Sequence, residues 1–174
     1  MGSSKVKSEF NFSKLESEIN HIFSKKINVG LIGDKVSDKL KIIGAVHEYG
    51  CVIKVTQKMR AFLHREGLHL KKETAVIVIP ERSYIRATLR NANQVKKVVN
   101  VLIDRIPMLF QEKISAEKIL KEAGVILKGE VQETITKTDY KALHPFTIEK
   151  TGRDKPLINR GILRASINFE VKNK

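Results

Sequence analysis

Residues 94–106 read QVKKVVNVLIDRI and have the most regular hydrophobic pattern in the chain. Their apolar side chains recur at steps of three and four residues: Val95, Val98, Val99, Leu102, Ile103 and Ile106. Because an α-helix has 3.6 residues per turn, this spacing predicts an amphipathic helix, which ends before or near Pro107. A helix with one continuous apolar face must bury that face against another element, so the rest of the chain must fold around it.

A second long helix is predicted over residues 115–135. Ser115 has a side chain of the kind that caps helix N-termini, and Glu117 favours the first turn because its charge is attracted to the positive end of the helix dipole. The apolar stripe of this helix consists of Ala116, Ile119, Leu120, Ala123, Leu127, Val131 and Ile135. A shorter amphipathic helix is predicted over 12–23, with Ser13 as its cap.

Four short runs of apolar and β-branched residues predict strands, at about 27–32, 52–55, 75–79 and 166–171. Together these elements predict an α+β fold, in which one small antiparallel sheet packs against the two long helices and an N-terminal helix is added. Residues 1–40 are assigned to an N-terminal arm with the first helix and strand, and 41–174 to the main α+β domain. We expect the two parts to form one compact unit.

Shorter segments complete the predicted fold. Residues 56–64 predict a helix capped by Thr56, and residues 83–89 predict a helical turn capped by Ser83. Residues 136–160 lack hydrophobic periodicity and are punctuated by proline and glycine, so they predict a loop-rich segment. Long loops in compact domains carry function more often than the elements they connect, and this one is a candidate contact surface.

Charge is the unusual bulk property of the chain. Its 174 residues include 33 Lys and Arg against 19 Asp and Glu, a net charge of +14. Such a charge attracts nucleic acid or an acidic protein surface. The basic residues are spread along the sequence without an arginine-rich tract, which is typical of solvated lysine faces. A dedicated nucleic-acid groove is the alternative interpretation.

Residue types that carry catalysis or bind metals are scattered along the chain. Cys51 has no second cysteine to pair with, and a glycine separates His64 from His69, so the two histidines do not form the i, i+4 pair of a helical zinc site. Gly30 and Gly33 lack the spacing of a phosphate-binding loop. We therefore expect no enzyme activity, no metal and no cofactor. No stretch approaches the roughly 18 consecutive apolar residues of a membrane span, so we expect no membrane partner.

Three blocks of sequence form a pattern more specific than any single motif. The first reads HEYG at 47–50 and VTQKMRAFL at 55–63, the second IPERSYIR at 79–86, and the third KTG at 150–152, KPLI at 155–158 and GILRASI at 161–167. Their order and content resemble the phage virion morphogenesis proteins, a broad group of tail-completion and neck proteins of tailed phages and prophages. Gln57 stands where that family more often has proline, and Asn159 and Arg160 replace its usual Asp-Thr.

The resemblance covers about residues 44–171 and implies a structural role in virion assembly, in tail completion or in joining the tail to the head. It implies a location in the virion, and in the bacterial host cytoplasm during assembly. The implied partners are other phage tail or neck proteins and further copies of this chain in a ring, with non-specific DNA contact as a further possibility. The competing class of function is a basic nucleic-acid-binding protein.

Arginines are the candidate assembly interface, because guanidinium groups are favoured at interfaces and pair with carboxylates through two hydrogen bonds. The candidates are Arg60, Arg82, Arg86, Arg153 and Arg164. For Arg82 and Arg86 an alternative remains open, in which they pair inside the chain with Glu81 or Glu48 and only fix the fold.

Overall fold

The computed structural model describes residues 11–111, 113–158 and 161–174. The first ten residues of the N-terminal part assigned over 1–40, and the departure from the family pattern at Asn159 and Arg160, lie outside the described residues. The elements are α1 (Phe12–Ser24), β1 (Lys25–Gly30), α2 (Asp38–Tyr49), β2 (Cys51–Lys54), α3 (Gln57–Arg65), β3 (Val76–Ile79), α4 (Ile85–Arg90), α5 (Ala92–Phe110), α6 (Ala116–Lys137), α7 (Pro145–Thr151), α8 (Ile162–Ala165) and β4 (Asn168–Asn173). The predicted α+β fold, with its N-terminal helix, is confirmed.

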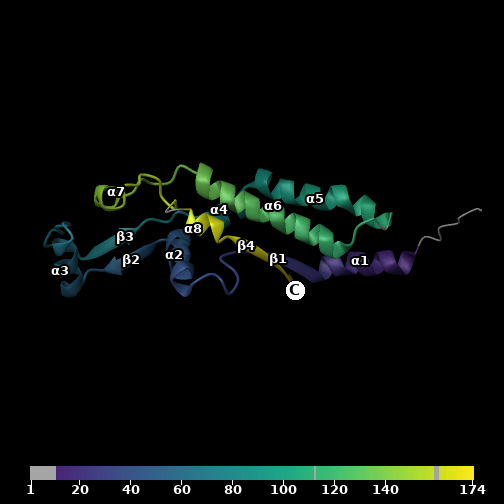
Figure 1. Ribbon diagram of the computed structural model, residues 1–174, viewed down its shortest axis with the longest axis horizontal. Coiled ribbons are helices and arrows are strands. Elements are labelled where there is room, and N and C mark those ends of the chain that lie inside the picture. The colour runs from purple at the N-terminus through teal and green to yellow at the C-terminus, as the bar shows by residue number, and fades with distance from the viewer. Residues whose placement is uncertain (1–10, 112, 159–160) are drawn as a thin grey trace, which may run out of the picture.

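The molecule is elongated, and its long axis follows the two long helices (Figure 1). Helices α5 and α6 lie side by side, and β1 and β4 lie along α6. At one end of the long axis α3 packs with β2 and β3, and α1 lies at the other end. We call the segment from β2 through α3 to β3, residues 51–79, the hairpin lobe.

The expected single sheet is wrong, because the four strands form two separate two-stranded antiparallel sheets. Strand β1 pairs with β4, with Val29 opposite Phe169, and β2 pairs with β3, with Val52 opposite Val78. Alternating apolar residues identify strands, but they do not say which strands pair. The first pair joins two distant parts of the chain beneath α6, and the second is confined to the hairpin lobe.

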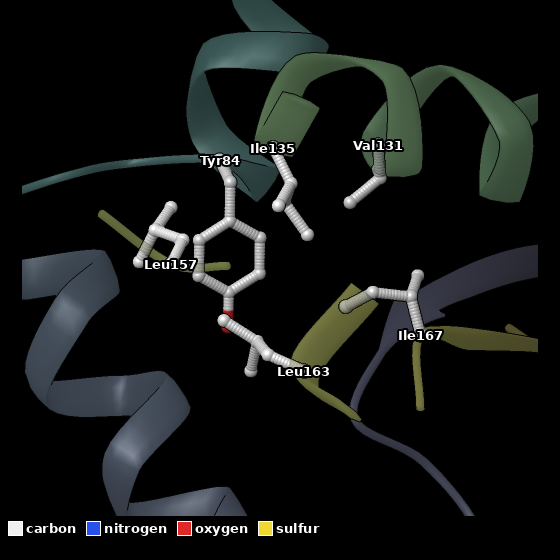
Figure 2. Close-up of a cluster of buried hydrophobic side chains, with 6 residues drawn as sticks. All are labelled: Tyr84, Val131, Ile135, Leu157, Leu163 and Ile167. Atoms are coloured by element: carbon white, nitrogen blue, oxygen red, sulfur yellow. The ribbon is translucent and has the colours of Figure 1, made fainter. Parts of the chain in front are cut away.

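Helix α6 is the centre of the core. Every side chain of its predicted apolar stripe is buried, which confirms that prediction. Near its C-terminal end, Val131 and Ile135 pack in a cluster with Tyr84, Leu157, Leu163 and Ile167 (Figure 2). The core therefore combines the last turns of α6 with residues from the second and third sequence blocks.

Helix α5 buries less of its stripe than its pattern predicts. Val99, Ile103 and Ile106 are exposed, and they lie on one face of the helix because they are four and three residues apart. Pro107 does not end the helix, which continues to Phe110. A proline one turn from a C-terminus removes a single backbone hydrogen bond, a loss that the remaining packing tolerates here.

Residues 136–160 contain more helix than expected. Helix α6 extends to Lys137, and α7 begins at Pro145, where a missing N–H costs nothing because the first turn has no acceptor for it. The predicted caps Thr56 and Ser115 are confirmed. The cap predicted at Ser13 is wrong, because Asn11 accepts the hydrogen bond from the N–H of Lys14.

Two glycines of α6 provide a matched test of the packing between α6 and β4. A Cβ at Gly124 would overlap the ring of Phe169, whereas a Cβ at Gly129 would meet no heavy atom within 4 Å. Both substitutions to alanine gain about 1 kcal/mol of helix propensity. We expect Gly129→Ala to raise the free energy of unfolding and Gly124→Ala to lower it by about 1–2 kcal/mol through overpacking, measured by urea denaturation. Equal stabilisation by both changes would contradict the close approach of β4 to α6.

Candidate functional site

The first two sequence blocks meet at a buried carboxylate. Glu48, near the C-terminal end of α2, is only 4% exposed. Its oxygens accept hydrogen bonds from the backbone N–H groups of Tyr84, Ile85 and Arg86, at 2.7, 3.0 and 2.9 Å, and from the Ser83 hydroxyl at 2.9 Å. A side chain from one helix thus caps the start of another, since these N–H groups open α4 and have no acceptor within it.

The predicted cap at Ser83 is therefore wrong. Helix α4 begins after Tyr84, whose side chain makes no capping bond, and the Ser83 hydroxyl donates to Glu48 instead of accepting from the helix. The cap comes from a residue far away in sequence, and no local pattern could have identified it. A carboxylate at this place is also favoured by the positive end of the short helix.

Arg86 completes the arrangement around Glu48, which we call the Glu48 junction (Glu48, Glu81, Ser83, Tyr84, Ile85 and Arg86). Its guanidinium donates to the Glu48 carboxylate at 3.2 Å, to the backbone carbonyl of Glu48 at 2.5 Å and to Glu81 at 3.0 Å. It also lies over the Tyr49 ring, 4.4 Å from the centroid. Arg86 thus pairs inside the chain with Glu48 and Glu81, which is the alternative that the sequence left open.

The Glu48 junction keeps its carboxylate charged. Burial alone would raise the pKa of Glu48, but hydrogen bonds from the backbone of Arg86, Ile85 and Tyr84 and from the Ser83 side chain outweigh burial and hold that pKa below 4.5. The same carboxylate and burial together raise the pKa of Tyr84. The charged carboxylate thus acts as a strong hydrogen-bond acceptor that holds the start of α4 against the end of α2.

Arg82 is buried, at 4% exposed, and binds a carbonyl instead of a carboxylate. Its Nε and Nη2 atoms donate to the backbone oxygen of Lys141, at 3.3 and 3.2 Å, and its backbone N–H donates to the carbonyl of His47 at 2.8 Å. It therefore ties the chain after α6 to the end of α2. A side chain with so little exposed surface offers almost nothing to a neighbouring subunit.

The remaining candidate arginines lie apart from this junction. Arg60 donates to the carbonyls of Leu70, Lys71, Lys72 and Thr74 and so holds the connection from α3 to β3. Arg153 is half-buried after α7, and Arg164 is exposed on α8. The five arginines thus do not form one surface, and contact with a neighbour stays a prediction for those that remain accessible.

A cavity of about 300 Å³ lies between α2, α7 and α8. Its walls are mainly apolar and include Leu40, Ile43, Leu143, Ile158 and Ile162, and its polar lining consists of His47, Thr147, Thr151, Arg153 and Lys155. Burial, together with the nearby charge of Arg82, lowers the pKa of His47 below 6.5, so the imidazole is neutral at pH 7. Its Nδ1 atom is buried and has no hydrogen-bond partner. Sequence reasoning missed this cavity, because its walls come from two distant parts of the chain: α2, and the residues from Leu143 to Leu163 that line it.

Leu157 forms part of the wall and has a strained backbone. Its φ is 64°, a left-handed value that no other non-glycine residue adopts in the described part of the chain. For a residue with a Cβ this conformation costs roughly 1–2 kcal/mol. Such strain persists only where the surroundings enforce it, and it is concentrated at functional sites.

The other expectations concern metals and membranes. The rings of His64 and His69 contact each other edge to face at 4.4 Å between centroids, although their sequence spacing does not favour a pair. Among the described residues, no group of three or more His, Cys, Asp or Glu side chains could hold a metal ion. No helix in the described ranges is long and apolar enough to span a bilayer.

Comparisons with protein-family models, with curated proteins and with solved structures return no match. The resemblance to the virion morphogenesis proteins therefore rests on its three sequence blocks alone.

Replacing Glu48 by glutamine tests the junction. The amide keeps the size of the side chain but loses one acceptor and the charge, so buried N–H groups of α4 lose their partner. We expect Glu48→Gln to lower the free energy of unfolding by about 2–4 kcal/mol at pH 7, measured by urea denaturation.

The pH dependence of that loss has a definite sign. Because the folded-state pKa of Glu48 lies below 4.5, its stabilisation is complete above pH 4.5 and disappears as the pH falls through the folded value. In acid, the free energies of unfolding of the wild type and of Glu48→Gln should therefore converge. Glu81→Gln is the control, since it removes an exposed partner of Arg86 and should cost less than about 1 kcal/mol. Equal losses of unfolding free energy in the two variants would contradict the view that the buried cap stabilises the fold more than an exposed ion pair does.

Proposed function

We propose that this chain is a non-enzymatic structural subunit of a phage or prophage virion, acting in tail completion or in joining the tail to the head. It acts in the virion, after assembly in the cytoplasm of the bacterial host, and its partners are other tail or neck proteins and further copies of itself. The three sequence blocks support this proposal. The observation that carries it is the amount of surface that the folded chain leaves in water.

The chain exposes 12503 Å² of surface. The size scaling of compact monomers gives about 8,600 Å² for a chain of 19.7 kDa. Leaving Met1–Phe10 out of account, with an upper bound of about 1,600 Å² for ten residues, still leaves a surplus of about 2,600 Å² over the scaling for the other residues. A standard interface buries about 800 Å² per partner, so the surplus suffices for several interfaces. A subunit that stabilises itself further by assembly has this property.

Exposed apolar side chains occur at both ends of the molecule as well as along the helices between them. Val52 and Val78 lie directly opposite each other and are exposed, on one face of the β2–β3 pair. Phe12 and Phe23 are exposed on α1, at the opposite end (Figure 1). A ring repeats one heterologous contact, which needs two different surfaces on each subunit. The two apolar ends supply such surfaces and support a homo-oligomeric ring.

Particle assembly tests the proposal directly. Electron microscopy of particles produced with and without this chain should show tailless heads or unjoined tails when it is missing, and the wild-type gene supplied in trans should restore normal particles. Val52→Asp with Val78→Asp should fail to restore them, although both side chains are exposed and the fold should survive. Normal infectious particles without the chain would contradict the proposal.

The net charge of +14 supports a second candidate, a nucleic-acid-binding protein. Internal ion pairs, such as Lys97 with Glu130 and Arg105 with Glu122, both at 2.8 Å, do not reduce this net charge, because it already counts the acidic residues. A DNA binder should bind duplex DNA at low salt and weaken steeply along a salt series, because bound phosphates release counterions. An assembly subunit need form no discrete complex with DNA at any salt concentration.

A further inference from the structure

The cavity between α2, α7 and α8 is open to solvent and has an apolar rim. Leu157 and Leu163, which Figure 2 shows beside Tyr84, separate it from the core. Ile43 and Ile162 also line it, and they are 39% and 53% exposed. Large apolar side chains that remain in water around a preformed hollow are expected where another molecule inserts.

We propose that this cavity, the α2–α7–α8 pocket, is a docking site for one large apolar side chain presented by an acidic polypeptide segment of a different protein. The inference rests on the proposed function, because it specifies the chemistry of one assembly partner. The volume of the pocket, about 300 Å³, is at the lower end of the range for binding pockets and suits a single anchoring side chain.

Charge determines which partner fits. Among the described residues, the polar lining contains Arg153, Lys155, two threonines and His47, and no carboxylate. Cations beside a desolvated apolar pocket attract a segment with Asp or Glu next to the inserted side chain. A second copy of this chain, with a net charge of +14, is a poorer source of such an acidic segment than a different protein, although copies can still meet through their apolar ends. The partner is therefore a different and acidic protein.

The pocket is preformed and held in place by the fold. Leu157 has a φ of 64°, so its backbone is strained at the wall of the pocket. Its side chain is nevertheless buried against the core, which shows that packing imposes the conformation. Helix α7 supplies Thr147 and Thr151 to the lining, and its Lys150 pairs with Glu66 at 3.6 Å, which links α7 to the end of α3 in the hairpin lobe. A rigid pocket lowers the entropic cost of binding an anchor side chain.

Three short fluorescein-labelled peptides serve as probes: DEFDE, DEADE and KKFKK, each titrated at low salt against the full chain labelled with ¹⁵N. Amide chemical shifts report both the affinity and the place of binding. We expect DEFDE to bind at least tenfold more tightly than the other two and to shift amides of α2, α7 and 152–158. Binding elsewhere, equal binding of all three, or no binding of DEFDE at millimolar concentration would overturn the proposal.

Matched variants separate the pocket from general surface effects. Ile162→Asp and Lys155→Glu should each weaken DEFDE binding at least tenfold. Ile103→Asp on α5 and Lys58→Glu on α3 should leave it unchanged. Ile103 is 58% exposed, close to the 53% of Ile162, but it lies outside the pocket. Unchanged binding by the pocket variants would refute the site. Shifts of the same amides on raising the concentration of the chain without peptide would identify a second copy as the occupant and contradict the choice of partner.

The outcome is independent of the particle experiment. Unjoined tails together with a failed peptide titration would leave the assembly role in place and remove the pocket. Normal particles together with a positive titration would contradict the assembly role and leave the pocket as a binding site.

Discussion

The buried carboxylate of Glu48 is the interaction on which the arrangement of the molecule depends. Strand β2 follows α2 almost at once, and β3 leads directly into 79–86, so both ends of the hairpin lobe pass through the Glu48 junction. A two-stranded sheet by itself is marginally stable in water. Glu48 lies on α2, which leads into the lobe, and it binds residues 84–86, which follow the lobe. It thereby holds the two ends of the lobe together and fixes the lobe on the helical body.

From this junction a chain of polar contacts continues into the core. The Thr88 hydroxyl donates to the carbonyl of Tyr84 at 2.7 Å and lies 2.7 Å from the hydroxyl of Thr134 on α6. The Tyr140 hydroxyl donates to the carbonyl of Ser83 at 3.2 Å, from the other side. Buried polar groups that are satisfied in this way specify one arrangement of their elements, because any other would leave them unpaired. The hairpin lobe, α4 and α6 are thus positioned by the same set of bonds, and the pocket between α2, α7 and α8 borders it.

Local pattern predicted the elements well and their long-range partners poorly. The stripe of α6 was predicted residue by residue, because a helix that is surrounded by packing partners buries its apolar positions regardless of which partners they are. The stripe of α5 was predicted as a helix face, but Ile103 and Ile106 are exposed. The pairing of strands, the cap of α4 and the cavity depend on contacts between residues that lie more than 20 positions apart in sequence. Arg86 and Glu48 lie in separate sequence blocks, and the internal pairing of Arg86 that the sequence left open as an alternative was its one indication of the junction.

A rigid body with a positioned lobe, surplus exposed surface and an apolar pocket fits an assembly subunit, whose work is to present fixed surfaces to neighbours. Amide hydrogen exchange in Glu48→Gln tests the central claim most directly. Exchange at Tyr84, Ile85 and Arg86 and in the β2–β3 pair should accelerate at least tenfold more than exchange at Val131 and Ile135 of α6, because local release of the lobe then precedes global unfolding. A uniform acceleration at all these amides, or none at α4, would contradict the role assigned to Glu48.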